Sequence, residues 1–108
     1  MASATYFQRG EALDYTNTGS NKIEVGTVLK IGTRIGIAGD DINPKATGVL
    51  HVTGVYNFKK TGTNEIKMGT TVYFDGNGIT ETAGSNAVAG YAAEDATAGA
   101  TTIKVKIG

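Results

Sequence analysis

The sequence predicts an all-β fold, a small barrel or sandwich of short strands joined by Gly-rich turns. Gly and Thr each account for 16 of the 108 residues, whereas Pro occurs once and Leu three times. Thr is β-branched and favours strands, and Gly supplies the positive φ angles that tight turns need. Short runs in which apolar and polar residues alternate indicate half-buried strands. We expect residues 1–108 to form a single domain, because this length suits one hydrophobic core.

The last strand has the clearest pattern. Ile103, Val105 and Ile107 alternate with two lysines. The three apolar side chains should therefore face a core while the lysines face solvent. Further strands are expected at residues 12–16, 27–31, 34–38, 48–58 and 87–92, with a bulge or bend at Gly54 within the run 48–58.

A turn signal lies at residues 75–78, where Asp-Gly and Asn-Gly separate two strand-like runs. Such pairs adopt the conformations of tight turns, so we expect a hairpin over residues 71–82. The same four residues resemble the start of a calcium-binding loop. However, Asn86 stands where that loop has its bidentate Glu, and the intervening ligand pattern fails. We interpret the segment as a turn.

The chain contains an internal echo. IEVGTVLKI at residues 23–31 returns as IKMGTTVYF at residues 66–74, and IGIAGDD at 35–41 returns in altered form as AGYAAED at 89–95. The first pair is 43 positions apart and the second 54, so the second copy has 11 additional residues, which contain the expected hairpin.

Each copy of this echo continues through a turn into a longer strand. We therefore expect a pseudo-duplicated β-domain with repeats at residues 23–58 and 66–107. A chance echo is the alternative, because Gly, Thr and Ala are common in this chain. Two copies are also too few for a solenoid.

Charge and composition argue against several classes of function. Ten basic and ten acidic residues give zero formal net charge without a basic block, so nucleic acid is not expected as a partner. The chain has neither a signal-like start nor an apolar run of about 18 residues, so no membrane association is expected. Cys is absent, which removes disulfides, thiolate metal sites and cysteine nucleophiles.

Catalytic chemistry has little support in the sequence. His51 is the sole histidine and lacks partners for a triad, so we expect a structural role. Two acidic pairs occupy equivalent places in the two copies, Asp40-Asp41 and Glu94-Asp95. They could hold calcium or act as an acid and a base, but turn carboxylates also bond their own backbone, and we prefer that interpretation. We expect no enzyme activity, no metal and no cofactor.

The N-terminal segment does not fit a self-contained barrel. Residues 1–10 precede the first expected strand and should form an extended arm. Tyr, Phe and Arg are enriched where one protein anchors to another. The candidate interface residues are Ala4, Thr5, Tyr6, Phe7, Gln8 and Arg9. In the alternative, Tyr6 and Phe7 cap the barrel of their own chain.

An ordered set of Gly and apolar positions runs through the chain as YFQRGEALDYTN, I..G.VL.IG..IGIA..DI, G.L.V.GVY.F.K, I..G..VYFD, G.A and V.V.I. From Tyr6 to Ile107 this order resembles the capsid cement, or decoration, proteins of phages and prophages. The match contains no catalytic residue to carry over.

The resemblance implies a structural virion protein that is made in the host cytoplasm and docks on the outer surface of an expanded head. There it would brace the major capsid protein against the pressure of packaged DNA, with no enzyme activity. A homo-oligomer is implied, and we prefer a trimer. The segment at residues 4–9 could pair with a capsid edge strand by β-augmentation.

A carbohydrate-binding or tail-associated adhesion module is the alternative, since it would also be a small β-domain. Such sites usually stack sugars on exposed aromatics, whereas this chain has no Trp, five Tyr and three Phe. A small hydrolase would need the two acidic pairs in one cleft with perturbed pKa values.

Overall fold

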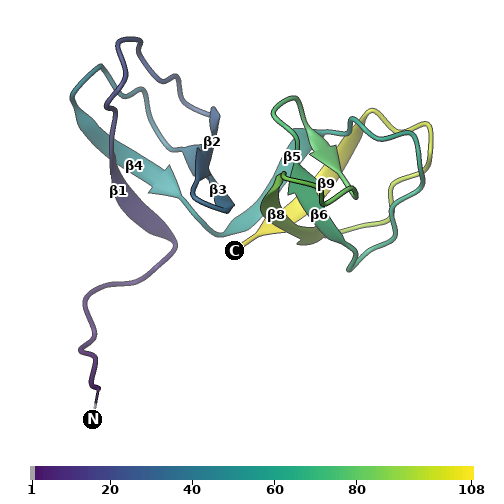
Figure 1. The fold of residues 1–108 in the computed structure, drawn as a ribbon, viewed down its shortest axis with the longest axis horizontal. Helices are drawn as coiled ribbons and strands as arrows, with labels where there is room; N and C mark the ends of the chain where they lie inside the picture. The colour runs from purple at the N-terminus through teal and green to yellow at the C-terminus, as the bar shows by residue number, and fades with distance from the viewer. Residues whose placement is uncertain (1) are drawn as a thin grey trace.

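The computed structural model describes residues 2–108, which form one nine-stranded sheet without a helix (Figure 1). The predicted all-β class is therefore confirmed. The strands are β1 (Ala12–Thr16), β2 (Val28–Ile31), β3 (Arg34–Ala38), β4 (Thr47–His51), β5 (Gly54–Lys59), β6 (Thr71–Phe74), β7 (Ile79–Thr80), β8 (Ala87–Ala92) and β9 (Thr102–Ile107).

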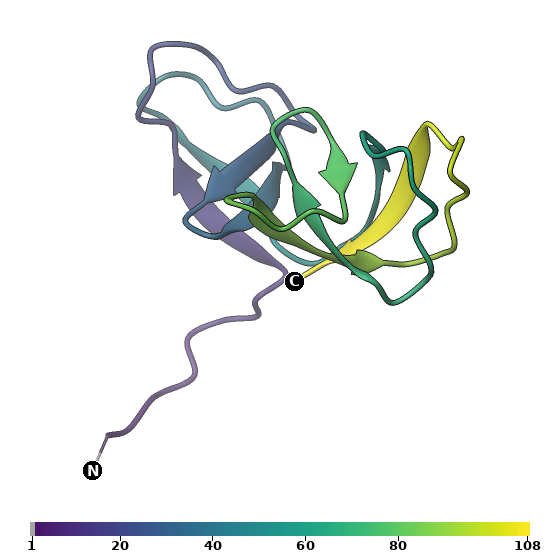
Figure 2. The ribbon, with the colours of Figure 1, turned by 45° about the vertical axis from the view of Figure 1, so that its right-hand side comes forward.

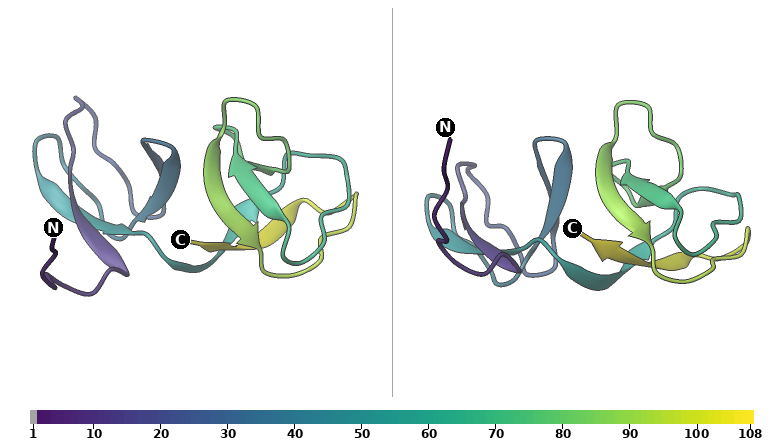
Figure 3. Two further views of the ribbon diagram at one scale, coloured as in Figure 1. Left: turned by 60° about the horizontal axis from the view of Figure 1, so that its bottom comes forward. Right: turned by 90° about the horizontal axis from the view of Figure 1, so that it is seen from below.

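The sheet has two halves that lie side by side (Figures 1, 2 and 3). The first half, residues 11–52, contains β1 to β4, and the second half, residues 54–107, contains β5 to β9. Where the halves meet, β3 runs parallel to β8. The halves also share apolar packing, because Ile35 and Ile37 of β3 belong to the buried cluster of the second half.

The sheet as a whole is open. Its main path runs β1-β4-β3-β8-β6-β7, with β2 added to β3, and β9 placed between β5 and β8. Among the described residues, β1 pairs only with β4 and β2 pairs only with β3. The barrel or sandwich expected from the sequence is therefore not confirmed.

Within the second half, β7 brings the strands into a ring. It pairs with β6 at Phe74↔Ile79, and Ile79 also bridges Lys60, directly after β5. The N–H of Thr61 donates to the carbonyl of Ile79 at 2.9 Å. The strands β5, β9, β8, β6 and β7 thus follow one another around the core. The first half has no such ring in residues 11–52, because the additional residues that contain β7 occur only in the second copy.

The second half holds most of the core. Ile103, Val105 and Ile107 of β9 are at most 1% exposed, in agreement with their predicted alternation. A buried aliphatic side chain contributes roughly 1.5–3 kcal/mol. The other members of the cluster are Ile35, Ile37, Phe58, Ile66, Val72, Ile79, Ala87, Ala89, Ala92 and Ala96.

Matching hydrogen bonds recur in the two halves. Ile23 and Ile42 exchange backbone bonds of 2.9 and 2.7 Å, and Ile66 and Ala96 exchange bonds of 2.9 and 2.8 Å. In pairing as well as in order, β1 corresponds to β5, β2 to β6, β3 to β8 and β4 to β9. The repeated phrase in the sequence therefore coincides with a repeated set of backbone contacts.

The glycine of each repeated phrase occupies a left-handed turn. Gly26 has a φ of 87° and Gly69 a φ of 91°, a region that side-chain-bearing residues adopt only at a cost. From this conformation the N–H of Gly26 donates to Ala38 and that of Gly69 to Ala92, both at 2.8 Å. The turn therefore requires the glycine in both copies.

One predicted strand is wrong. Residues 48–58 do not form a continuous strand but two, β4 and β5, which are separated by Val52 and Thr53 and pair with different neighbours. The strand breaks because the chain passes from the first half to the second here, and Gly54 begins β5 with a φ of 119°. The hairpin expected over residues 71–82 is present as β6 and β7.

We predict that Ile79→Ala lowers the free energy of unfolding by about 2–5 kcal/mol, because it removes a fully buried side chain at the point that joins β6 to β5. Val55→Ala is the matched control, since Val55 is 56% exposed and should change stability by about 0.5 kcal/mol or less. Urea denaturation measures both. Equal effects of the two substitutions would contradict this role of Ile79.

Candidate interaction surface

The N-terminal segment, residues 2–9, lies outside the sheet and extends away from the first half (Figure 1). Tyr6 is 83% exposed and Phe7 is 90% exposed. Neither side chain caps the sheet of its own chain, so that alternative does not hold in this structure. Within the described residues, the single hydrogen bond from this segment joins Gln8 Nε2 to the carbonyl of Ala12 at 3.3 Å.

The acidic pairs are not brought together, since one lies in each half. Asp41 accepts the N–H of Val25 at 2.8 Å, and Asp95 accepts the N–H of Met68, also at 2.8 Å. Each carboxylate thus holds the turn that contains Gly26 or Gly69. The bonded N–H groups lie 16 and 27 positions away in the sequence, so these are not the local backbone bonds expected of turn residues. The neighbouring Asp40 and Glu94 bond elsewhere, to the N–H of Val49 at 3.2 Å and to the ammonium of Lys104 at 3.4 Å.

Among residues 2–108, His, Asp and Glu side chains form no group of three that could hold a metal ion. The same residues include no helical segment with the length and hydropathy of a membrane span.

His51 lies on β4, beside an apolar hollow of about 360 Å³ between the two halves. Val28, Ile37, Tyr56 and Phe58 also line the hollow. A single imidazole without a neighbouring nucleophile or carboxylate in this lining makes no catalytic set. The structure therefore places His51 in a packing environment.

The turn of the β6–β7 hairpin is organised by Asp75. Its carboxylate accepts the hydroxyl of Thr61 at 2.7 Å and the N–H groups of Asn77 and Gly78, each at 2.9 Å. The Thr61 hydroxyl bond chiefly lowers the pKa of Asp75, the backbone bonds lower it further, and partial burial opposes them. The oxygens that a calcium ion would need are thus occupied by donors.

Two exposed apolar side chains were not found by sequence reasoning. Val25 is 61% exposed and Met68 is 66% exposed, and they occupy the same place in the two repeated phrases, at the tips of the carboxylate-bound turns. The alignment of the two repeated phrases places an apolar residue directly before the turn glycine in both. The alternation of a strand does not account for an apolar residue in a turn, so this shared position was the available signal. They add apolar surface at two matched places.

We predict that Asp75→Asn destabilises the fold at neutral pH and that its difference from the wild type shrinks as the pH falls. A lowered folded-state pKa stabilises the protein above the unfolded-state value of about 4, and this contribution is lost as the pH falls through the folded-state pKa. Melting temperatures between pH 7 and pH 2.5 measure it. Asp14→Asn removes an exposed carboxylate on β1 and is the control for the loss of one surface charge. A constant difference across this range for Asp75→Asn would contradict the assignment.

Comparison with known proteins adds the family. The family model of the phage cement proteins matches residues 7–107 and so includes all nine strands. No curated protein and no solved structure matches the chain. The chain therefore belongs to the phage cement protein family and has a structural role associated with the phage capsid.

Proposed function

We propose that this protein docks on the outer surface of the expanded phage head and stabilises the lattice of the major capsid protein. The observation that supports this role is an exposed aromatic segment, with Tyr6 and Phe7, on a member of the cement family. Such side chains are typical anchors between proteins.

Docking of this kind needs no chemistry. A protein that binds only the expanded lattice stabilises that state by mass action, in proportion to its affinity and concentration. Many copies on one shell add their contributions. The chain suits this role because the carboxylates of Asp41 and Asp95 hold turns and the formal net charge is zero. We propose neither enzyme activity nor nucleic acid binding.

The segment Ala4–Arg9 is the proposed contact. Its backbone is free to add a strand to an exposed sheet edge on a neighbouring subunit of the shell, the mode known as β-augmentation. We further propose a homo-oligomer, with a trimer preferred, and an internal duplication as the origin of the two halves. The matching hydrogen bonds and strand pairings support the duplication.

We predict saturable co-sedimentation of the purified protein with expanded heads of a phage that encodes it, and no binding to unexpanded heads. Binding should track expansion because the docking surface exists only on the expanded lattice. Counting copies per capsid subunit at saturation measures the stoichiometry. Equal binding to both head forms would refute state-specific docking. Absence of binding to both would refute the proposal and make a glycan-binding screen the next step.

We predict that Tyr6→Ser combined with Phe7→Ser weakens head binding by about 30-fold or more, the loss typical of an anchoring aromatic pair. Deletion of residues 2–9 should have at least the same effect. Val55→Ser is the matched control, because it removes an exposed apolar side chain from the sheet. Asp41→Asn combined with Asp95→Asn should leave docking largely intact. Undiminished binding after the deletion would dispose of residues 4–9 as the contact.

A further inference from the structure

We propose that the first half lacks its closing strand and that residues 2–9 of a second copy of this chain supply it. The inference rests on the proposed function because docking on one shell brings copies of this chain close together. It names the partner of the N-terminal segment and the acceptor that receives it, which we call the open edge: the unpaired side of β2 together with Asn17 at the end of β1.

The second half shows what belongs at the open edge. There, Ile79 of β7 lies between Phe74 of β6 and Lys60 after β5. The residues 43 positions earlier are Ile31 on β2 and Asn17 after β1. In residues 11–52 no strand lies between these two places, because β2 pairs with β3 only. Its other side presents unpaired backbone groups, which is the condition for strand addition.

Burial differs between the halves as a missing strand requires. Three apolar residues that are at most 6% exposed in the second half have counterparts that are only half-buried in the first. Strand pairing and the 43-residue offset make the counterparts equivalent. The pairs are Phe58 and Tyr15, Ile66 and Ile23, and Val72 and Leu29. The interior of the first half is therefore incompletely covered.

The N-terminal segment has the properties of the missing strand. It carries two large apolar side chains, Tyr6 and Phe7, where β7 contributes the fully buried Ile79. Successive side chains of a strand point to opposite faces, so one of the two aromatics would enter the interior of the first half. Residues 2–9 make no backbone hydrogen bond within the described chain and remain available for pairing.

Strand direction shows why the segment comes from another copy. β7 runs antiparallel to β6 and parallel to the chain at Lys60, so a strand at the open edge would run parallel to the end of β1. Only Gly10 and Glu11 separate the segment from β1, and a chain that folds back over so short a link runs antiparallel. A parallel arrangement needs a crossover of about a dozen residues or more.

The reach of the segment fits such an exchange. Eight extended residues span about 26 Å, and the shortest dimension of the molecule is 23 Å. Because each copy donates a segment and accepts one at a different surface, the contact is head-to-tail and closes into a ring when the rotation allows it. A closed ring of three is the form that agrees with the preferred trimer.

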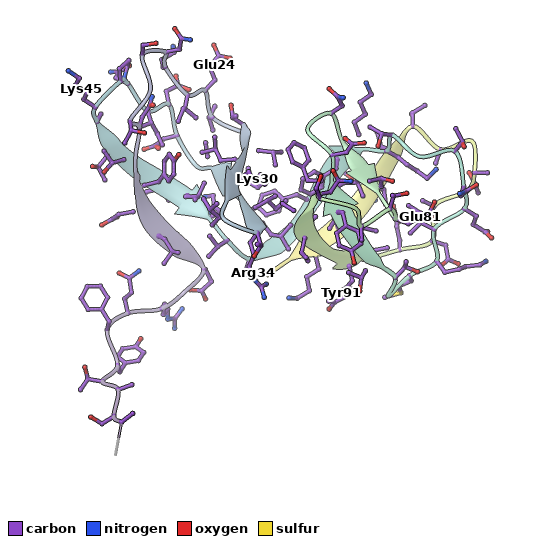
Figure 4. The ribbon with its side chains drawn as sticks, in the orientation of Figure 1. Glu24, Lys30, Arg34, Lys45, Glu81 and Tyr91 are labelled. Carbon is purple, nitrogen blue, oxygen red and sulfur yellow. The ribbon has the colours of Figure 1, made fainter. Side chains whose placement is uncertain are left out.

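Single-cysteine variants test the inference directly, because the chain has no Cys of its own. Gln8→Cys reports the segment, and Lys30→Cys reports the open edge, where Lys30 lies on β2 between the halves (Figure 4). The two variants are mixed, oxidised in solution and on expanded heads, and separated on a non-reducing gel. Since each chain has one cysteine, a mixed disulfide can form only between copies. Moving the segment cysteine through residues 5–9 finds the register.

The matched control is Lys67→Cys, an exposed lysine of the second half whose side chain is 66% accessible. We expect the Gln8→Cys and Lys30→Cys mixture to give at least a tenfold higher yield of mixed dimer than Gln8→Cys with Lys67→Cys at the best register. Tyr6→Ser combined with Phe7→Ser should lower that yield to the control value. Yields equal to the control at every register, both in solution and on heads, would overturn the inference.

The outcomes separate this inference from the proposed function. Head binding without mixed dimers leaves the docking function and removes the exchange of segments, whereas mixed dimers without head binding do the reverse. A photoreactive benzophenone attached at Lys30→Cys identifies the occupant by mass spectrometry. Labelled residues 2–9 from another copy support the inference, and a labelled capsid segment overturns it.

Discussion

Closure around Ile79 is the constraint on which the rest of the structure depends. Its backbone joins β6 to the end of β5, and its side chain is buried in the cluster that fills the second half. Strands that are paired on both sides leave few backbone N–H and C=O groups without a hydrogen bond. In residues 2–108, no buried side-chain nitrogen or oxygen lacks a hydrogen-bond partner either. The first half is joined to that closed core through β3, whose Ile35 and Ile37 belong to the same buried cluster.

The polar residues at matched places show how the two halves solve the same problem differently. Asn17 and Lys60 are both buried at the end of their strands, at 3% and 5% exposure. The Asn17 amide donates to the carbonyls of Asn21 and Ile42, while the Lys60 ammonium donates to those of Gly62 and Ala98. In each case a buried side chain donates to backbone carbonyls of neighbouring loops, and the carbonyl of Ile42 also accepts the N–H of Ile23. The two side chains share the donor role, while the amide oxygen of Asn17 also accepts the N–H of Gly19 at 3.0 Å.

Local sequence patterns predicted most of the strands and turns. The features that depend on pairing between distant strands could not be predicted from them. Alternation located β9, the Asp-Gly and Asn-Gly pairs located the hairpin, and the echo located the two turns with glycine in the left-handed region. The break at residues 52–53 could not be read from the same signals, since nothing in the run GVLHVTGVYNF says that its ends pair with different strands. Closure of the second half depends on the pairing of β5 with β9, whose partners lie 43 to 53 positions apart, and on the bridge from Lys60 to Ile79, 19 positions apart. Periodicity within a strand does not report either pairing.

The candidate contact was also predictable only in part: the N-terminal segment was predicted, and the surface that accepts it was not. Residue type and position outside the first strand singled out residues 4–9, and the structure leaves Tyr6 and Phe7 exposed. The open edge was not predicted from the sequence. The only sign of it is that the first copy lacks the 11 additional residues of the second copy. The structure shows that these residues contain β7, which lies between β6 and the end of β5.

The pairing of β5 with β9 also determines when the chain can fold. Gly54 is opposite Ile107, and the register continues to Lys59 and Thr102, so two neighbouring strands of the core are separated by more than 40 positions in the sequence. Contacts of such long sequence separation form late, because the intervening loop must first be closed. During synthesis the core stays incomplete until Ile107 has been added. The core can therefore form only after β9 has been translated. The exposed N-terminal segment is synthesised well before that point.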